Sequence, residues 1–273
     1  MWAVADMELI VNGKPYTTNA STLLDLKVEL QIPSDVTILN GFQVSENLDI
    51  KEGDLVTLIQ KGKMPSQNEL ESMMCARHTP NVHNKVKEAK VAIAGLGGLG
   101  SNIAILLART GVGTLFLVDF DVVEPSNLNR QSYYISHLGL PKTEALKQQI
   151  EQINPFIKVK TKQIRVTEEN AHSLFEEYPI VCEAFDNPIS KAILVNTLLE
   201  QSPKTKLVCG SGMAGYGSSN TIQTVRKMKH LYMCGDGSTA AEVGNGLMAP
   251  RVTVCAAHQA NMVLRLILGI EEV

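Results

Sequence analysis

The chain has 273 residues, a formal net charge of -3, 44% apolar residues and 19% charged residues. This composition excludes a disordered chain, and the length leaves room for one large domain and one small one. The sequence contains no long run of one charge and no apolar stretch of about 18 residues, so neither nucleic acid nor a membrane is an expected partner. Because the N-terminus shows no basic region followed by an apolar one, we expect a cytoplasmic protein.

The five cysteines are widely spaced and form no Cys-x-x-Cys pair. An odd and scattered set of cysteines argues against a disulfide framework. The spacing also excludes a structural zinc site with four thiolate ligands, so we expect no zinc.

Residues 1–62 carry the signals of a small α+β domain. The hairpin signal Asn12-Gly13 separates two short β-type segments, and a segment with one apolar face starts at Ser21 and ends at Ile32. We expect strands over residues 7–11, 16–19, 36–40 and 55–60, and a helix over residues 21–32. The order strand, strand, helix, strand, strand is typical of a β-grasp fold.

This small domain resembles a family of sulfur carriers. The segments 38–41 (Ile-Leu-Asn-Gly) and 52–56 (Glu-Gly-Asp-Leu-Val) resemble the thiamine sulfur carrier ThiS, over residues 7–62. ThiS-like carriers end in a free Gly-Gly, whose carboxylate is the reacting group. Here Gly62 is followed by Lys63-Met64-Pro65 and the chain continues, so we expect this domain to have no activatable terminus.

The rest of the chain divides into an arm and a large α/β domain. Residues 63–89 are polar and interrupted by Pro65 and Pro80, which predicts a connecting arm of one or two short helices. Residues 90–273 repeat the pattern strand, turn, helix, which predicts a Rossmann-like, mostly parallel sheet with flanking helices. The expected strands cover residues 91–94, 114–118, 157–164, 180–184 and 206–209, and the expected helices cover residues 101–110, 142–153, 168–176, 190–201 and 253–268.

A glycine-rich turn joins the first expected strand and helix of the large domain. Its glycines are Gly95, Gly97, Gly98 and Gly100. A turn of this kind lets the backbone approach phosphate oxygens, and the N-terminus of the following helix attracts anions. Asp119 lies nineteen residues after Gly100, at the end of the next strand, where a carboxylate can accept hydrogen bonds from ribose hydroxyls. These features predict a nucleotide site and leave an NAD-dependent oxidoreductase open.

A polar and basic cluster follows Asp119 and separates the two readings. Expulsion of pyrophosphate from a triphosphate requires cations where negative charge accumulates, whereas a dehydrogenase needs no such cluster. Arg130 and Lys142 can supply the cations, and Asn127 and Gln131 can donate hydrogen bonds. Asp121 belongs to the same cluster, which favours ATP as the nucleotide.

A later expected strand ends in a further acidic side chain. Asp186 follows the segment 180–184, at the edge of the sheet where open α/β sheets bind their ligands. Mg²⁺ on phosphates is usually held by one or two protein carboxylates. Asp186 is therefore the candidate Mg²⁺ ligand.

With these motifs, residues 70–270 resemble the ThiF/MoeB/HesA adenylyltransferases, relatives of the ubiquitin-activating enzymes. The resemblance implies that the glycine turn and Asp119 hold ATP, that residues 126–131 and Lys142 bind the triphosphate, and that Asp186 binds Mg²⁺. It also implies a homodimer in which an arginine of one subunit reaches the triphosphate of the other. Arg77 is the matching candidate.

The resemblance implies ATP-dependent adenylation of the C-terminal glycine carboxylate of a ThiS-like sulfur-carrier protein supplied in trans. The fused ThiS-like domain points to thiamine (thiazole) biosynthesis, while molybdopterin synthesis and a modified tRNA base stay open as alternatives. An NAD-dependent oxidoreductase is a second class of function. A third is a non-catalytic binding module in which the β-grasp domain plugs its own carrier site.

Two further features leave more than one role open. Some members of the family use a cysteine on a mobile loop, and Cys234 lies in a glycine-rich polar stretch that could expose it. Cys182, Cys209 and Cys255 lie in apolar patterns and are expected to be buried. The glycine-dense segment 210–217 either receives the tail of the carrier or forms a tight loop.

Overall fold

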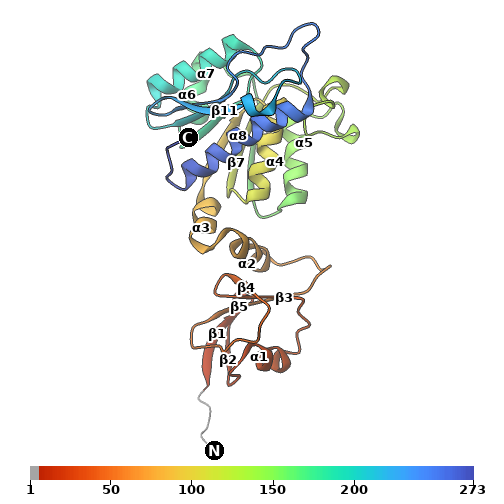
Figure 1. The fold of residues 1–273 in the computed structure, drawn as a ribbon, viewed down its shortest axis with the longest axis vertical. Helices are drawn as coiled ribbons and strands as arrows, with labels where there is room; N and C mark the ends of the chain where they lie inside the picture. Colours follow the sequence, from red (N-terminus) through yellow and green to blue (C-terminus); the bar gives the residue numbers. More distant parts are fainter. Residues whose placement is uncertain (1–5) are drawn as a thin grey trace, which may run out of the picture. The chain divides into compact units, whose positions relative to one another are not determined.

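The computed structural model describes residues 6–273, with the exception of the Pro80 side chain. The chain forms two compact units, one that ends at Asn84 and one that covers Lys85–Val273, and each is described by itself (Figure 1).

The first unit is built on a five-stranded sheet with the order β2-β1-β5-β3-β4. Its elements are β1 (Met7–Val11), β2 (Lys14–Thr18), α1 (Leu23–Leu30), β3 (Val36–Leu39), β4 (Phe42–Val44) and β5 (Leu55–Ile59). β1 and β5 run parallel, whereas the other neighbours are antiparallel. The β-grasp order is therefore confirmed. The short strand β4, which follows the turn Asn40-Gly41, was not expected because three residues carry too little pattern to be recognised.

Helices lie against both faces of this sheet. The core under α1 includes Leu26, Val56 and Leu58, which are all buried. Helix α2 (Gln67–His78) packs against β3, β4 and β5, and Thr57 of β5 donates a hydrogen bond to Ser72 of α2 over 3.0 Å. Successive side chains of a strand point to opposite faces, so α2 covers the face that α1 leaves free.

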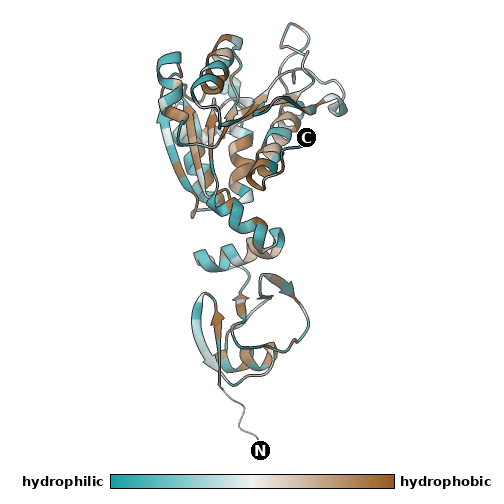
Figure 2. Ribbon diagram, turned by 90° about the vertical axis from the view of Figure 1, so that its left-hand side faces the viewer, coloured by the Kyte–Doolittle hydropathy of each residue, from teal (hydrophilic) through white to brown (hydrophobic). Residues whose placement is uncertain are grey.

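Helix α2 thus belongs to the first unit, although it lies in the segment that the sequence assigns to a connecting arm. Its N-terminus is stabilised by a capping box, in which Ser66 and Glu69 bond each other's backbone N–H groups. Helix α3 (Pro80–Glu88) follows and contains the boundary between the units. Both helices are largely hydrophilic (Figure 2).

The second unit is built on a seven-stranded sheet with the order β11-β12-β10-β9-β6-β7-β8. Its strands are β6 (Lys90–Ala94), β7 (Thr114–Asp119), β8 (Lys158–Gln163), β9 (Ile180–Glu183), β10 (Lys206–Gly210), β11 (Gln223–Met228) and β12 (Leu231–Gly235). All neighbouring pairs are parallel except β11 and β12. This arrangement confirms the mostly parallel sheet, and it adds the unexpected pair β11 and β12.

Helices cover both faces of the second sheet. They are α4 (Gly98–Thr110), α5 (Lys142–Ile153), α6 (Glu168–Phe175), α7 (Pro188–Gln201) and α8 (Ala249–Ile267). α4 lies between α5 and α8 on one face, and α6 and α7 lie together on the other (Figure 1). Ala92 and Ala94 of β6 point toward Phe175 and Leu194 on the α6 and α7 side. Among the described residues no helix combines the length and the apolar character needed to cross a membrane.

Candidate functional site

The second unit contains a cavity of about 540 Å³ at the carboxyl ends of β6, β7, β9 and β10. Parallel sheets bind ligands at this edge, because the loops that leave neighbouring strands diverge there. Nine of the residues singled out in the sequence line it, namely Gly95, Gly97, Gly98, Asp119, Asp121, Arg130, Gln131, Lys142 and Asp186. Residues that are far apart in the chain are therefore brought to one site.

The glycine turn between β6 and α4 forms the base of this cavity. Gly95 has a φ of +88°, which side chains disfavour, and a Cβ there would lie 2.9 Å from the carbonyl oxygen of Ala184. A Cβ on Gly100 would collide with the carbonyl oxygen of Gly95, so Gly100 shapes the turn from within α4 without lining the cavity. Gly97 caps α4 without any side-chain hydrogen bond, which leaves the first N–H groups of the helix open to an anionic ligand.

Asp119 ends β7 beside this turn and is 8% exposed. Its carboxylate accepts hydrogen bonds from the backbone N–H groups of Leu96 (2.6 Å) and Asp121 (2.8 Å). Burial raises the pKa of Asp119, although these bonds and the nearby Lys142 oppose the shift. The hydrogen bonds fix the side chain at the edge of the cavity, where its oxygens can also accept from ribose hydroxyls.

The two cations of the cluster reach the cavity in different ways. Lys142, at the start of α5, is buried, and its ammonium pairs with the carboxylate of Asp121 at 3.1 Å. Arg130 is half-buried and donates to the backbone oxygen of Ser126 (3.2 Å) and to the side chain of Asn129 (2.9 Å). Both charges line the cavity, and the side chain of Arg130 lies beside Gly98 at the start of α4.

The two amides of the cluster differ in their placement. Gln131 is 8% exposed and lines the cavity, and its side-chain oxygen has no hydrogen-bond partner among residues 6–273. Burial of a polar atom without a hydrogen bond costs free energy, unless a ligand or a water molecule donates to it. Asn127 instead accepts a hydrogen bond from the backbone of Glu124 (3.1 Å) and does not line the cavity. In this structure Asn127 stabilises the turn that carries Arg130.

Asp186 is exposed, lines the cavity and forms no ion pair with any described residue. No group of three or more His, Cys, Asp or Glu side chains in the described chain surrounds a metal position. A lone free carboxylate fits Mg²⁺ that is bound jointly by a protein group and phosphate oxygens, because Mg²⁺ keeps several waters and needs no closed protein cage.

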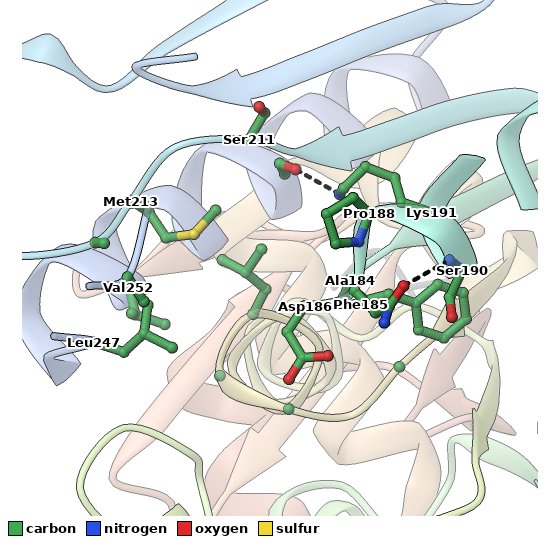
Figure 3. Close-up of a pocket in the computed structure, with 18 of the residues that line it drawn as sticks. Ala184, Phe185, Asp186, Pro188, Ser190, Lys191, Ser211, Met213, Leu247 and Val252 are labelled. Atoms are coloured by element: carbon green, nitrogen blue, oxygen red, sulfur yellow. Dashed lines mark hydrogen bonds between the residues drawn. The ribbon is translucent and has the colours of Figure 1, made fainter. Parts of the chain in front are cut away.

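Several lining residues were not singled out in the sequence. The guanidinium of Arg165 stacks on the ring of Phe120 at 3.8 Å, beside Asp119. Lys191 of α7 pairs with the fully buried Glu183 and lines the cavity at the ends of β9 and β10 (Figure 3). Phe120 and Glu183 lie next to motif residues at the ends of strands, and this position in the sequence indicates that they lie near the site. Their partners, Arg165 and Lys191, are identified only by the fold.

A buried ion pair holds two loops of the cavity wall together. Arg251 of α8 donates to the backbone oxygens of Gly217 (2.9 Å) and Ser218, and it pairs with Asp236. Burial disfavours the charged form of Asp236. Hydrogen bonds from Thr239, Ser238 and Arg251 outweigh this effect and together hold the pKa of Asp236 well below its usual range. The pair thus joins α8 to two loops that line the cavity.

The glycine-dense segment 210–217 is one of these loops. Its residues from Gly210 to Ala214 line the cavity, as the close-up of Ser211 and Met213 shows (Figure 3). The same segment is tightly folded, because the N–H of Asp236 donates to the oxygen of Gly212 and the N–H of Gly215 donates to that of Gly246. A tight loop and a cavity wall are therefore combined in one segment.

Cys234, the candidate for a thiol role, lacks the exposure that such a role requires. Cys234 lies in β12, paired with Gly210 of β10, and is 0% exposed. Burial raises the pKa of its thiol to about 11, so very little thiolate forms at neutral pH. The short strand β12 ends at Gly235 and is followed by Gly237, which is why the stretch resembles a loop in the sequence. Cys182, Cys209 and Cys255 are buried as expected.

Arg77 lies on α2 in the first unit and is not among the residues that line the cavity.

Comparisons with known proteins agree with this geometry. The profile of the ThiF family matches residues 71–273, and that of the ThiS-like ubiquitin family matches residues 7–62. The adenylyltransferase and sulfurtransferase UBA4 of Candida glabrata is 31% identical over 193 residues, which are 68% of this chain and 44% of UBA4. UBA4 of Saccharomyces cerevisiae is 32% identical over 194 residues, which are 68% and 43% of the two chains. The chain thus matches less than half the length of these relatives.

Two solved structures share the fold of the second unit. The E. coli tRNA N6-threonylcarbamoyladenosine dehydratase TcdA in complex with ATP superimposes with a TM-score of 0.67 at 23% identity, covering 76% of this chain and 98% of TcdA. E. coli MccB with AMPCPP and MccA superimposes with a TM-score of 0.56 at 24% identity, covering 75% and 64% of the two chains. The chain belongs to the ThiF family and carries a ThiS-like ubiquitin domain at its N-terminal side.

Proposed function

We propose that this protein adenylates the C-terminal glycine carboxylate of a ThiS-like sulfur-carrier protein at the expense of ATP, releasing pyrophosphate. The observation that carries the proposal is the cavity itself. It collects the glycine turn, Asp119, Arg130, Lys142 and Asp186, which are the groups that a nucleoside triphosphate and its metal ion require.

The chemistry requires no general base. A C-terminal carboxyl group has a pKa of about 3.5, so it is already a nucleophile at neutral pH. The carboxylate attacks the α-phosphorus, and the bond to the β-phosphate breaks with its electron pair on the departing pyrophosphate. Arg130, Lys142 and the helix N-terminus at Gly97 offer positive charge to that leaving group. Mg²⁺ held by Asp186 and phosphate oxygens would supply further neutralisation.

The names and bound ligands of similar proteins support this proposal. UBA4 is named as an adenylyltransferase and sulfurtransferase, and TcdA has been crystallised with ATP and with AMP. MccB has been crystallised with an ATP analogue and MccA. The assignment to thiamine biosynthesis rests on the ThiS-like domain alone. We propose in addition that the protein is a homodimer in which Arg77 of one copy reaches the triphosphate bound by the other.

The first unit, which lacks a Gly-Gly terminus, is proposed as a helper of the carrier site and not as the substrate. In the competing proposal it plugs that site. Removal of residues 1–62 separates the two, because release of a plug raises the activity on an added carrier, whereas loss of a helper lowers it. Circular dichroism must accompany this comparison, since α2 packs against the sheet that the deletion removes.

The main proposal is tested by exchange of labelled pyrophosphate into ATP. We expect exchange that depends on an added carrier ending in Gly-Gly and on Mg²⁺. Absence of exchange with every such carrier, together with tight binding of NAD, would contradict the proposal and favour an oxidoreductase.

A further inference from the structure

Lys191 and Glu183 form an ion pair in the cavity wall, at the ends of β9 and β10. Glu183 ends β9 and is 0% exposed, and Lys191 lies in the first turn of α7. The ammonium of Lys191 donates to the Glu183 carboxylate and, over 2.7 Å, to the backbone oxygen of Gly210 at the end of β10. The other carboxylate oxygen of Glu183 accepts from the N–H of Phe185 at 2.8 Å.

This network is poorly explained by stability. Removal of two charges from water costs several kcal/mol each, and apolar residues of similar size often stabilise a core equally well. Burial raises the pKa of Glu183 in spite of the opposing Lys191, as expected for a carboxylate removed from water. A charge pair kept in such a place is expected to position one of its members for another task.

The exposed member of the pair is Lys191, whose side chain remains 25% exposed and lines the cavity. An ammonium group carries three N–H donors, and only two of those of Lys191 are engaged in the hydrogen bonds described above. Figure 3 shows Lys191 on one side of the cavity and Met213, Leu247 and Val252 on the other, with Asp186 between them. The side chains of Ser211, Met213 and Val252, which also line the cavity, carry no charge.

We infer that Lys191 is a further catalytic residue, whose remaining N–H binds one oxygen of the substrate carboxylate while the other oxygen attacks ATP. The inference rests on the proposed function. An anionic nucleophile must approach an anionic triphosphate, and a cation on its path lowers that repulsion. Lys142 pairs with Asp121 after β7 and Arg130 lies beside Gly98, whereas Lys191 lies at the ends of β9 and β10. We therefore assign the first two cations to the phosphates and Lys191 to the substrate carboxylate.

The step is balanced without a further reactant. A bond forms between the free carboxylate oxygen and the α-phosphorus, and the bond from the α-phosphorus to the bridging oxygen breaks. The oxygen bound by Lys191 becomes the carbonyl oxygen of the acyl-adenylate, so its negative charge is lost and no proton moves. Glu183 acts as a positioning residue, because it holds the ammonium between the ends of β9 and β10.

The test uses the full-length protein and a charge-neutral double variant. Lys191→Met alone leaves the buried Glu183 unpaired, so Lys191→Met is combined with Glu183→Gln to remove both charges at once. We expect the double variant to bind ATP within about threefold of the wild type and to lose about 100-fold in carrier-dependent pyrophosphate exchange. Retention of exchange within about threefold would show that Lys191 only neutralises Glu183, and would overturn the inference.

A binding measurement isolates the carboxylate contact from the chemistry. Calorimetry with a non-hydrolysable ATP analogue compares a peptide ending in Gly-Gly with the same peptide ending in a carboxamide. We expect the wild type and Lys191→Arg to prefer the carboxylate by about tenfold, and the double variant to bind both equally. A preserved preference in the double variant contradicts the inference.

Lys204→Met is the matched control, since Lys204 is exposed and lies outside the cavity. It should leave both exchange and peptide preference as in the wild type. Failure of the proposed function would be recognised separately, because the wild type itself would then show no exchange, while the peptide comparison would still report on Lys191.

Discussion

The two units of this chain are both sheets covered by helices, yet the cavity lies in the second. In the first unit most neighbouring strands are antiparallel and are joined by tight turns such as Asn12-Gly13 and Asn40-Gly41. In the second unit the strands from β6 to β10 pair in parallel, so each connection between them passes through a helix. Loops that diverge at the carboxyl ends of such strands leave room for a ligand. The connection between strands therefore decides where a site can form.

The first prediction tests whether the cavity of the second unit is the reaction site, by removing the carboxylate of Asp186, which is proposed to bind Mg²⁺. Asp186→Ala should lower carrier-dependent pyrophosphate exchange by about 1,000-fold or more, because the phosphate charge loses its metal ion. Thermal unfolding should change little, since Asp186 is exposed and has no ion-pair partner among the described residues. Glu200→Ala, which removes an exposed carboxylate of α7 outside the cavity, is the control. Exchange at the wild-type rate in Asp186→Ala would refute the assigned role.

The second prediction concerns the stability of the second unit. Asp236→Asn should lower its free energy of unfolding by about 3 kcal/mol at neutral pH, because Arg251 remains buried without its partner. The pKa of Asp236 is lowered in the folded protein, so the ionised form stabilises the fold above the ordinary aspartate pKa. The difference in Tm between wild type and variant should be constant above about pH 5 and shrink below about pH 4. A difference that grows in acid would contradict this assignment.

The third prediction concerns the first unit alone. Ser66→Ala removes the capping box of α2 and should destabilise the first unit by about 1 kcal/mol. Affinity for ATP, measured by calorimetry, should not change, because the cavity residues lie in the second unit and Arg77, proposed to act in trans, lies at the other end of α2 from Ser66. Ser173→Ala, at an exposed hydroxyl of α6, is a suitable comparison for the loss of a surface serine. A loss of ATP affinity in Ser66→Ala would show that the units are energetically coupled.

The smallest effect is expected at the thiol of β12. Cys234→Ala should leave pyrophosphate exchange within about twofold of the wild type, because a buried thiol with a pKa of about 11 forms little thiolate. Mass spectrometry after treatment of the native protein with iodoacetamide at about pH 8 should find Cys234 unmodified and Cys75, which is partly exposed, modified first. Rapid modification of Cys234 would show that β12 opens readily.

Much of the second unit could be predicted from sequence, because its signals are local. The apolar strand before Gly95, the glycine turn and the acid at Asp119 each follow from short-range patterns, and the predicted helix over residues 142–153 coincides with α5. The short strands β4 and β12 were missed. Three to five residues carry too little periodicity, and glycines beside them resemble loop signals.

Local sequence determined which residues could carry nucleotide chemistry, since a glycine turn, a strand-end acid and a cation act through their own side chain or backbone. Only the tertiary structure decided which of them share a cavity. In it Asn127 supports its own turn, Cys234 is buried in β12 beside β10, and Lys191 lies at the ends of two strands. The physical reason is that burial and pairing depend on neighbours brought from distant parts of the chain, and no local pattern records them.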